Sequence, residues 1–368
     1  MVFLIILTSS IVAWTLLLIL LPISAHIGLV DKPCARKQHN GEIPLIGGLA
    51  IATSLLSVWL YYFEWNSTLL ALVIASSLMV TTGVLDDKFD LSVRLRIVMQ
   101  ILASSIIVFV GGVEISTLGN VLGFGEIELG VLGGIFTVLA IMTAMNAYNM
   151  VDGIDGLLGG LSLVAFVGIC ILSWMAGLAI PFVFALSFVF ALIPYLVLNL
   201  QTNETKLKKV FMGDAGSMFI GLSIVWILAL LTNPALTEAF SLRASVLFDL
   251  VESHPIRPVA VLWLITIPLM DMLGIMVRRI VKKQNPFKPD RNHLHHIFMR
   301  AGFSSREALL IIVGSAAWWM FVGIWLEAQQ IAEPIVLAAY FAVFAIYLLC
   351  LKYSWRLVTL VRRFKGIS

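Results

Sequence analysis

The sequence predicts an all-α, polytopic integral membrane protein. Of its 368 residues, 60% are hydrophobic and only 12% are charged, and the mean hydropathy is +1.02, whereas soluble domains carry about 25% charged residues. Apolar stretches of the roughly 20 residues that cross a bilayer as a helix recur along the whole chain. We therefore predict one integral membrane domain over residues 1–368, with no separate soluble domain.

Polar breaks divide the chain into about eleven predicted transmembrane helices. They begin near residues 2, 46, 68, 96, 130, 157, 179, 215, 259, 307 and 333. The first lacks basic residues before it and a small-residue cleavage site after it, so we interpret it as a span rather than a signal peptide. The loops predicted to carry the active site lie at about residues 25–45, 86–96, 149–157, 201–215 and 278–306.

The basic residues predict the orientation of the chain. If the N-terminus is outside, 22 of the 24 Lys and Arg residues lie on the cytosolic side, and only Arg243 and Arg257 lie outside. Because Lys and Arg collect in cytosolic loops, we expect a cytosolic C-terminus. Nine of the ten aspartates also fall on or just inside the cytosolic side. Short carboxylates gathered at one face suit a hard divalent cation.

An acidic cluster ends the third predicted span. If the helix continues, Asp86 and Asp90 share a face at a spacing of four residues, and Asp87 lies beside Asp90 at a spacing of three. Carboxylates this close repel one another unless a cation or a raised pKa relieves them. We favour a functional site, and a solvated helix end beside Arg94 and Arg96 is the alternative.

The fifth predicted span ends in a polar motif, Asn-x-x-Asn-x-x-Asp-Gly-x-Asp-Gly. Its amide and carboxylate residues are Asn146, Asn149, Asp152 and Asp155. Because they recur every three residues, a helix end would present them on one face, and the glycines let the backbone approach a ligand. Polar groups at membrane depth are costly unless they are used. We predict a binding loop rather than a plain connection.

Asp214 opens the eighth predicted span, two residues before Gly216. It is placed to cap that helix. A helix N-terminus with glycines also binds anions such as a pyrophosphate, and a carboxylate there can hold the bridging metal ion. The two roles are compatible.

The longest polar loop ends in a group of side chains that can bind phosphate, namely Arg291, His293, His295 and His296. Arginine grips phosphate bidentately, and histidine serves in acid–base chemistry near neutral pH. Zinc is the alternative, but the chain has no Cys set or second His cluster to complete a tetrahedral site.

Asp271, inside the ninth span, keeps an open role: a functional carboxylate, a partner for an arginine, or the cap of a broken helix.

Four motifs together resemble the polyprenyl-phosphate N-acetylhexosamine-1-phosphate transferase family. They are Asp-Asp-x-x-Asp, the Asn-x-x-Asn motif above, Phe-Met-Gly-Asp-Ala-Gly-Ser and His-x-His-His, in this order and at span ends. The likeness runs from the glycine-rich segment at residues 41–48 to the His loop. The Pro-Asp-Arg-x-His-x-His-His loop is most similar to that of bacterial members that use UDP-GlcNAc and undecaprenyl phosphate. The peptidoglycan branch carries a differently arranged His loop.

The resemblance implies that the lipid phosphate attacks the β-phosphorus of UDP-GlcNAc and that UMP leaves, with Mg²⁺, or Mn²⁺ as a substitute, across the pyrophosphate. It implies a metal ligand at Asp214, with Asn149 or Asn146 as a further ligand. It implies catalytic handling of the lipid phosphate by Asp86 and Asp87. Substrate-binding roles fall on Asp90, Arg94, Arg96, Asp152, Asp155, Phe211, which would stack on uracil, and Arg291, His293, His295 and His296, which would hold the diphosphate or the sugar.

The resemblance also implies a place in the bacterial inner membrane, with the active site on the cytosolic face, and the first lipid-linked step of O-antigen and enterobacterial common antigen synthesis. No nucleic-acid partner is expected. Other donors (UDP-MurNAc-pentapeptide, UDP-GalNAc) stay open, as do a phospho-enzyme in place of direct attack, and a homodimer.

Three other protein classes fit the sequence less well than the transferase. An intramembrane aspartyl protease would need a Gly-x-Gly-Asp motif, and a CDP-alcohol phosphotransferase would need a longer Asp-Gly-x-x-Ala-Arg motif. A transporter, in which carboxylates form a proton path, would not need the His–Arg loop, and inverted repeats are not apparent. These observations favour the transferase.

Overall fold

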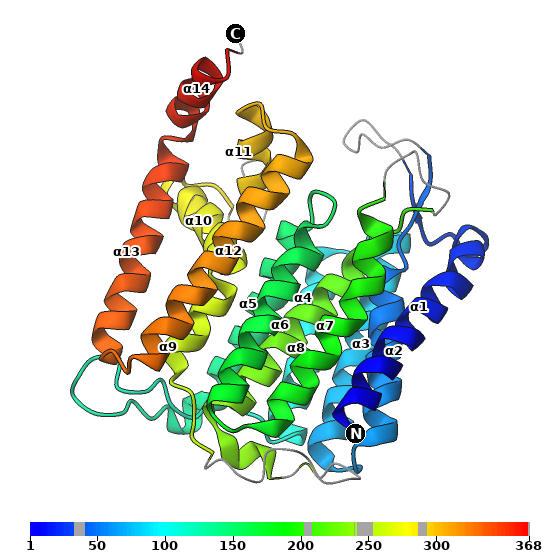
Figure 1. The fold of residues 1–368 in the computed structure, drawn as a ribbon, viewed down its shortest axis with the longest axis vertical. Helices are drawn as coiled ribbons and strands as arrows, with labels where there is room; N and C mark the ends of the chain where they lie inside the picture. The colour runs from blue at the N-terminus through cyan, green and yellow to red at the C-terminus, as the bar shows by residue number, and fades with distance from the viewer. Residues whose placement is uncertain (33–40, 202–207, 239, 241–252, 286–292, 367–368) are drawn as a thin grey trace.

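The computed structural model describes residues 1–32, 41–201, 208–238, 240, 253–285 and 293–366. The described chain is a bundle of long helices, with the two termini at opposite ends (Figure 1). The helices up to the eighth are α1 (Val2–Ile27), α2 (Gly47–Tyr62), α3 (Ser67–Phe89), α4 (Val93–Ser105), η1 (Ile106–Val110), η2 (Gly130–Leu132), α5 (Gly133–Val151), α6 (Leu157–Met175), α7 (Ala179–Asn199) and α8 (Gly213–Thr232). They are followed by η3 (Pro234–Thr237), α9 (Pro258–Val261), η4 (Leu262–Ile265), α10 (Thr266–Val281), α11 (Leu294–Arg300), α12 (Ser305–Ala328), α13 (Glu333–Lys352) and α14 (Ser354–Phe364).

Ten helical segments of the described chain are long and apolar enough to cross a membrane. Three of them join shorter elements: α4 with η1, η2 with α5, and α9 with η4 and α10. The eleventh predicted span is α2, which is apolar but only 16 residues long. The prediction of an all-α, multi-pass membrane protein is confirmed.

Helix α8 is the centre of the bundle. Every residue from Ala215 to Leu231 is buried, as expected for a helix that is apolar all round. It packs against α2, α3 and α5. A Cβ on Gly48 would lie 2.1 Å from the Gly216 nitrogen, and one on Gly83 would lie 2.3 Å from the Ala215 Cα. Only glycine permits such close contact, so the first turn of α8 is held tightly against α2 and α3.

A short antiparallel pair, β1 (Val30–Asp31) and β2 (Ile43–Pro44), precedes α2. The segment before α8 continues this hydrogen bonding, because the Phe211 amide donates to the Pro44 carbonyl at 2.8 Å. The Gly47 amide donates in turn to the Phe211 carbonyl at 2.9 Å. The glycine-rich segment therefore fixes the approach of the chain to Asp214.

Helices α10 to α14 form a second group at one side of the bundle, with α11 and α14 at the end that holds the C-terminus (Figure 1). Helix α10 packs against α5, α12 and α13, and α11 packs against α12 and α14. His293 immediately precedes α11, and His295 and His296 lie in its first turn.

Candidate active site

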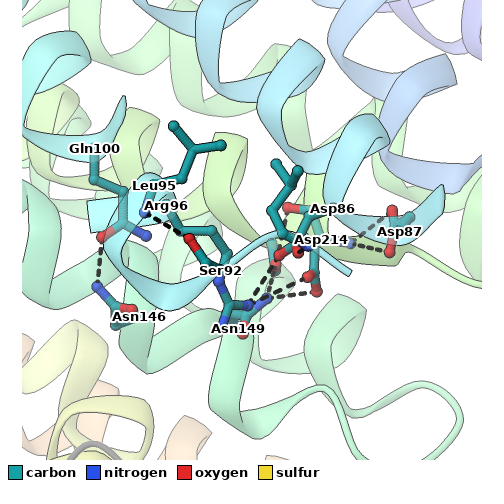
Figure 2. Close-up of polar contacts among 11 residues, drawn as sticks. Asp86, Asp87, Ser92, Leu95, Arg96, Gln100, Asn146, Asn149 and Asp214 are labelled. Carbon is teal, nitrogen blue, oxygen red and sulfur yellow. Dashed lines mark hydrogen bonds and ion pairs between the residues drawn. The ribbon is translucent and has the colours of Figure 1, made fainter. Parts of the chain in front are cut away.

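Three helix ends far apart in the sequence place their polar residues together. These are the end of α3, the end of α5 and the first turn of α8, and Figure 2 shows Asp86, Asp87, Asn149 and Asp214 grouped there with Arg96. The structure therefore brings together residues from three of the four motifs.

Asn149 and Asp214 are in direct contact. The Asn149 side-chain amide donates to Asp214 Oδ1 at 2.7 Å and to the Ser217 hydroxyl at 3.0 Å. Of the two asparagines predicted as a further metal ligand, only Asn149 contacts Asp214 among the described interactions. Ser217, one turn along α8 from Asp214, was missed because serines are common inside membrane helices.

Asp87, rather than Asp214, caps α8, which corrects the capping prediction. Both oxygens of Asp87 accept from the Asp214 backbone amide, at 3.0 and 3.1 Å. Gly213 has a φ of 74°, and a Cβ there would lie 2.4 Å from Asp87 Oδ2. A carboxylate at a helix N-terminus is stabilised by the unpaired amides. Asp214 is thereby left with its own carboxylate facing Asn149.

Asp86 is buried and holds the turn between α3 and α4. Its Oδ1 accepts from the Leu91 amide at 2.8 Å, and its Oδ2 accepts from Arg96 at 2.9 Å. The same Arg96 nitrogen lies 3.8 Å from Asp214 Oδ2. Arg96 therefore bridges the acidic residues of α3 and α8, and its side chain is 29% exposed.

Asp90, Arg94 and Asn146 lie apart from this contact network. Helix α3 ends at Phe89, and Asp90 is an exposed C-cap residue with a φ of 51°. The expectation that Asp86 and Asp90 share a helix face is therefore wrong. Arg94 is exposed, and Asn146 donates to Gln100 at 2.8 Å on the other side of Arg96 (Figure 2).

The loop after α5 carries Asp152 and Asp155 outside the helix, since α5 ends at Val151. Asp155 forms an ion pair with Lys209, and the Lys209 ammonium lies 5.6 Å from the centre of the Phe211 ring. The protein around the Asp152 carboxyl desolvates it, and Asp214 and Asp155 add negative charge, so the pKa of Asp152 is raised to about 7. Its side chain nevertheless reaches the surface.

Asn199 at the end of α7 joins two of the motifs and was missed by the sequence analysis. It accepts from the Gly156 amide at 2.6 Å and donates to the Val210 carbonyl at 2.8 Å. Its burial at 2% exposure makes both bonds hard to replace with water. Asn199 therefore sets the spacing between the loop after α5 and the segment before α8.

The His loop reaches the loop after α5 through His295. A Cβ on Gly153 would lie 2.2 Å from His295 Nε2, so the ring packs directly on the Gly153 backbone. Burial first, and then the neighbouring His296, lower the pKa of His295 to about 3. His295 is therefore neutral at physiological pH. Arg291 lies outside the described residues.

His293 is held by Asp271, whose role the sequence left open. The His293 Nδ1 lies 2.8 Å from Asp271 Oδ2, and the Leu294 amide donates to Asp271 Oδ1 at 3.0 Å. Asp271 thus accepts from the first amide of another helix, α11, rather than capping a break in its own helix, and a histidine is a side-chain partner. Among the described residues, no group of three or more His, Cys, Asp or Glu side chains is arranged to hold a metal ion.

The comparisons with known proteins agree with this arrangement. Residues 69–232, from α3 to the end of α8, match the model of glycosyl transferase family 4. An undecaprenyl-phosphate α-N-acetylglucosaminyl 1-phosphate transferase from Haemophilus influenzae is 40% identical over 96% of this chain and 95% of its own length. The chain belongs to this family. The resemblance predicted from the four motifs is confirmed.

Other relatives of the same name are similar over most of this chain and most of their own length. The protein of Yersinia pestis is 39% identical over 93% of this chain and 89% of its own length. That of Escherichia coli K12 is 38% identical with the same coverage. The family match spans Asp86, Asn149 and Asp214, and the His loop follows it. A transferase of the membrane, acting on a nucleotide sugar and a polyprenyl phosphate, is what this family implies.

Proposed function

We propose that the protein transfers GlcNAc-1-phosphate from UDP-GlcNAc to undecaprenyl phosphate and releases UMP. The observation that carries the proposal is the contact of Asn149 with Asp214 at the first turn of α8, beside Asp86, Asp87 and Arg96. A helix N-terminus that presents a carboxylate, an amide and a cation suits a diphosphate and its metal ion. The relatives' names supply the donor and the acceptor.

The residues at this site fit Mg²⁺, with Mn²⁺ as a substitute. Magnesium is usually held by one or two carboxylates, with substrate phosphates and water completing its octahedron. Asp214 has a side chain that is 31% exposed, and Asn149 adjoins it, so these two would hold the ion. Bound there, Mg²⁺ would neutralise charge that develops on the pyrophosphate. The pKa of Asp152 is raised first by burial and then by the charges of Asp214 and Asp155, so negative charge is concentrated beside this site.

The lipid phosphate would enter beside Arg96. A phosphate monoester has a second pKa near 6, so it is mostly ionised at neutral pH and needs no strong base. Phosphoryl transfer depends mainly on positioning and charge neutralisation. Arg96, between Asp86 and Asp214, is placed to attract the phosphate toward the metal site. We therefore favour direct attack on the donor, with Asp86 and Asp87 handling the lipid phosphate while they also hold Arg96 and the first turn of α8, respectively.

An apolar cavity next to this site suits the prenyl chain of the acceptor. The cavity has a volume of about 540 Å³ and lies between α5, α8 and the α9–η4–α10 segment. Ala147 and Tyr148 line it next to Asn149, and Leu228 and Val259 line it farther along α8 and α9. Apolar side chains dominate the lining, as expected for a surface that takes up a hydrocarbon chain from the bilayer.

The donor would lie along the loop after α5 and the segment before α8. Phe211 offers an aromatic ring for uracil, and Lys209 beside it is paired with Asp155. Asp152 and Asp155 would face the nucleotide, while His293, His295 and His296 would hold the diphosphate or the sugar.

We place this site on the cytosolic side of the bacterial inner membrane, since the positive-inside rule puts the connected loops there. The product would begin O-antigen and enterobacterial common antigen synthesis.

The test offers UDP-GlcNAc, UDP-GalNAc and UDP-MurNAc-pentapeptide side by side to the purified protein with undecaprenyl phosphate. We expect lipid-linked GlcNAc diphosphate and UMP from the first donor only. Preference for another donor would refute the sugar assignment and leave the reaction class intact. Transfer that persists in excess chelator would refute the metal assignment.

Asp214→Asn tests the metal ligand directly. We expect loss of transfer while the protein stays folded in the membrane, because the amide keeps the size of the side chain and removes its charge. Near-normal turnover by this variant would remove Asp214 from the site. Arg94→Gln likewise replaces a charged side chain with an amide, in the first turn of α4, and it should cost less because Arg94 is exposed.

A further inference from the structure

Asp271 is a buried carboxylate that none of the steps above uses. It lies in α10 with 1% of its surface exposed. A carboxylate buried at that depth is costly unless hydrogen bonds compensate it. Asp271 has three such bonds: to His293 Nδ1 at 2.8 Å, to the Leu294 amide at 3.0 Å and to the Tyr347 hydroxyl at 2.7 Å. Their donors lie in two other parts of the chain, the start of α11 and α13.

The bond to His293 fixes the ring. His293 is 6% exposed, and a nitrogen that donates to a carboxylate must carry its proton. Nδ1 is therefore the protonated nitrogen, which leaves Nε2 as the ring nitrogen for a substrate. A carboxylate that orients a functional histidine in this way typically affects the histidine's activity strongly without touching the substrate.

The bonds to Leu294 and Tyr347 fix Asp271 itself and the start of α11. Leu294 is the first residue of α11, and His295, one residue later, packs on Gly153 in the loop after α5. Tyr347 comes from α13, and a Cβ on Gly274, one turn after Asp271, would lie 2.8 Å from the Tyr347 ring. Gly274 thus provides the room in which Tyr347 reaches Asp271.

We infer that Asp271 is a positioning residue of the transferase, which sets the tautomer of His293 and the register of α11 against the loop after α5. Tyr347 supports it from α13. The inference rests on the proposed function, since it assigns a role within that reaction. It gives α10 and α13 a part in the site that the sequence motifs do not mark.

The test is a double-mutant cycle in the purified full-length protein, with UDP-GlcNAc and undecaprenyl phosphate as substrates. The variants are Asp271→Asn, His293→Gln and both together, and kcat, KM and thermal stability are measured for each. The Asp271→Asn side chain keeps the shape of the carboxylate and can still accept from the Leu294 amide, but its own amide group donates to Nδ1 and reverses the tautomer. We expect kcat to fall by about 10-fold to 100-fold, with a smaller change in KM for the donor.

The double variant separates positioning from a merely structural role. If Asp271 acts through His293, the double variant should be no slower than His293→Gln alone. Glu327→Gln is the matched control, because Glu327 is also a buried carboxylate, paired with Arg257 at 2.7 Å, at the far end of α12. It should lower thermal stability and leave kcat unchanged.

Tyr347→Phe keeps the test decisive if Asp271→Asn fails to fold. It removes one hydroxyl, and kcat should fall by about twofold to tenfold, with no further fall when His293→Gln is added. If the wild-type protein is active and the Asp271→Asn and Tyr347→Phe variants have the same kcat, the inference is overturned and the proposed function stands. Multiplicative losses in the double variants would overturn it as well. Absence of transfer by the wild-type protein would overturn the proposed function and the inference with it.

Discussion

Gly153→Ala should displace His295 and slow transfer without unfolding the protein. The φ of Gly153 lies outside the left-handed region, so the backbone accepts alanine. The new Cβ would lie 2.2 Å from His295 Nε2 and 2.3 Å from Cε1, whereas ordinary contact begins at 3.4 Å. The ring would therefore have to move by about 1.2 Å, the difference between 3.4 and 2.2 Å. A displacement near 1 Å costs about 100-fold in rate.

The assay compares kcat for lipid-linked GlcNAc diphosphate formation by Gly153→Ala and Gly314→Ala. Gly314 lies in α12 and a Cβ there would meet nothing within 4 Å, so this control should retain wild-type activity. Overpacking at Gly153 should cost about 1–3 kcal/mol of stability at most. In a His295→Ala background the added methyl group should have no further effect. Wild-type activity of Gly153→Ala, or an equal loss in both backgrounds, would refute the reasoning.

Three other predictions concern the neighbours of the site. Arg96→Lys should lower kcat by about tenfold or more, because a lysine cannot reach both acidic partners of Arg96; Arg94→Lys, which keeps the charge at an exposed position, should lose less. Asn199→Ala should reduce the free energy of unfolding by about 1–3 kcal/mol, measured by denaturation against Gln201→Ala, whose bond is exposed; equal stability of the two variants would contradict the role of Asn199. The third prediction concerns pH. The pKa of His295 is lowered to about 3 in the folded state, whereas the histidine of the unfolded chain takes up its proton below about pH 6.5. The free energy of unfolding should therefore fall by up to about 1.4 kcal/mol per pH unit as the pH falls from about 6.5 toward 3. A His295→Gln variant that keeps the same acid sensitivity would disprove this.

The sequence predicted the membrane helices well because a bilayer imposes a length and a composition that can be counted. Each predicted start lies within three residues of the observed one, including α2, which is shorter than the rest. The convergence of Asp86, Asn149 and Asp214 was also predictable, since polar groups at helix ends on one side of a bundle have few other places to go. The spacing of polar residues along the sequence did not predict which polar side chains contact one another.

The misplaced details depend on where a helix stops. Asp90 was expected on the face of Asp86, but the helix ends one residue earlier and Asp90 turns into a left-handed conformation. Capping of α8 was assigned to Asp214 within the helix, whereas Asp87 reaches its amide from α3. Such contacts depend on the distance between two packed helices, which residue spacing within one segment cannot predict.

The contacts that join the two halves of the molecule were the least predictable, and they bear most on mechanism. Asp86, Asn149 and Asp214 are positioned by α3, α5 and α8, whose backbones are locked together by glycine contacts. The histidines belong to the group of α10 to α14, and within the described residues they meet the first group where His295 packs on Gly153. A rigid acidic site with the histidines brought to it from a second group of helices allows donor and acceptor to be bound by different parts of the molecule. Substitutions at Gly153 or Asp271 should therefore disturb the alignment of the two parts while leaving the acidic site itself intact.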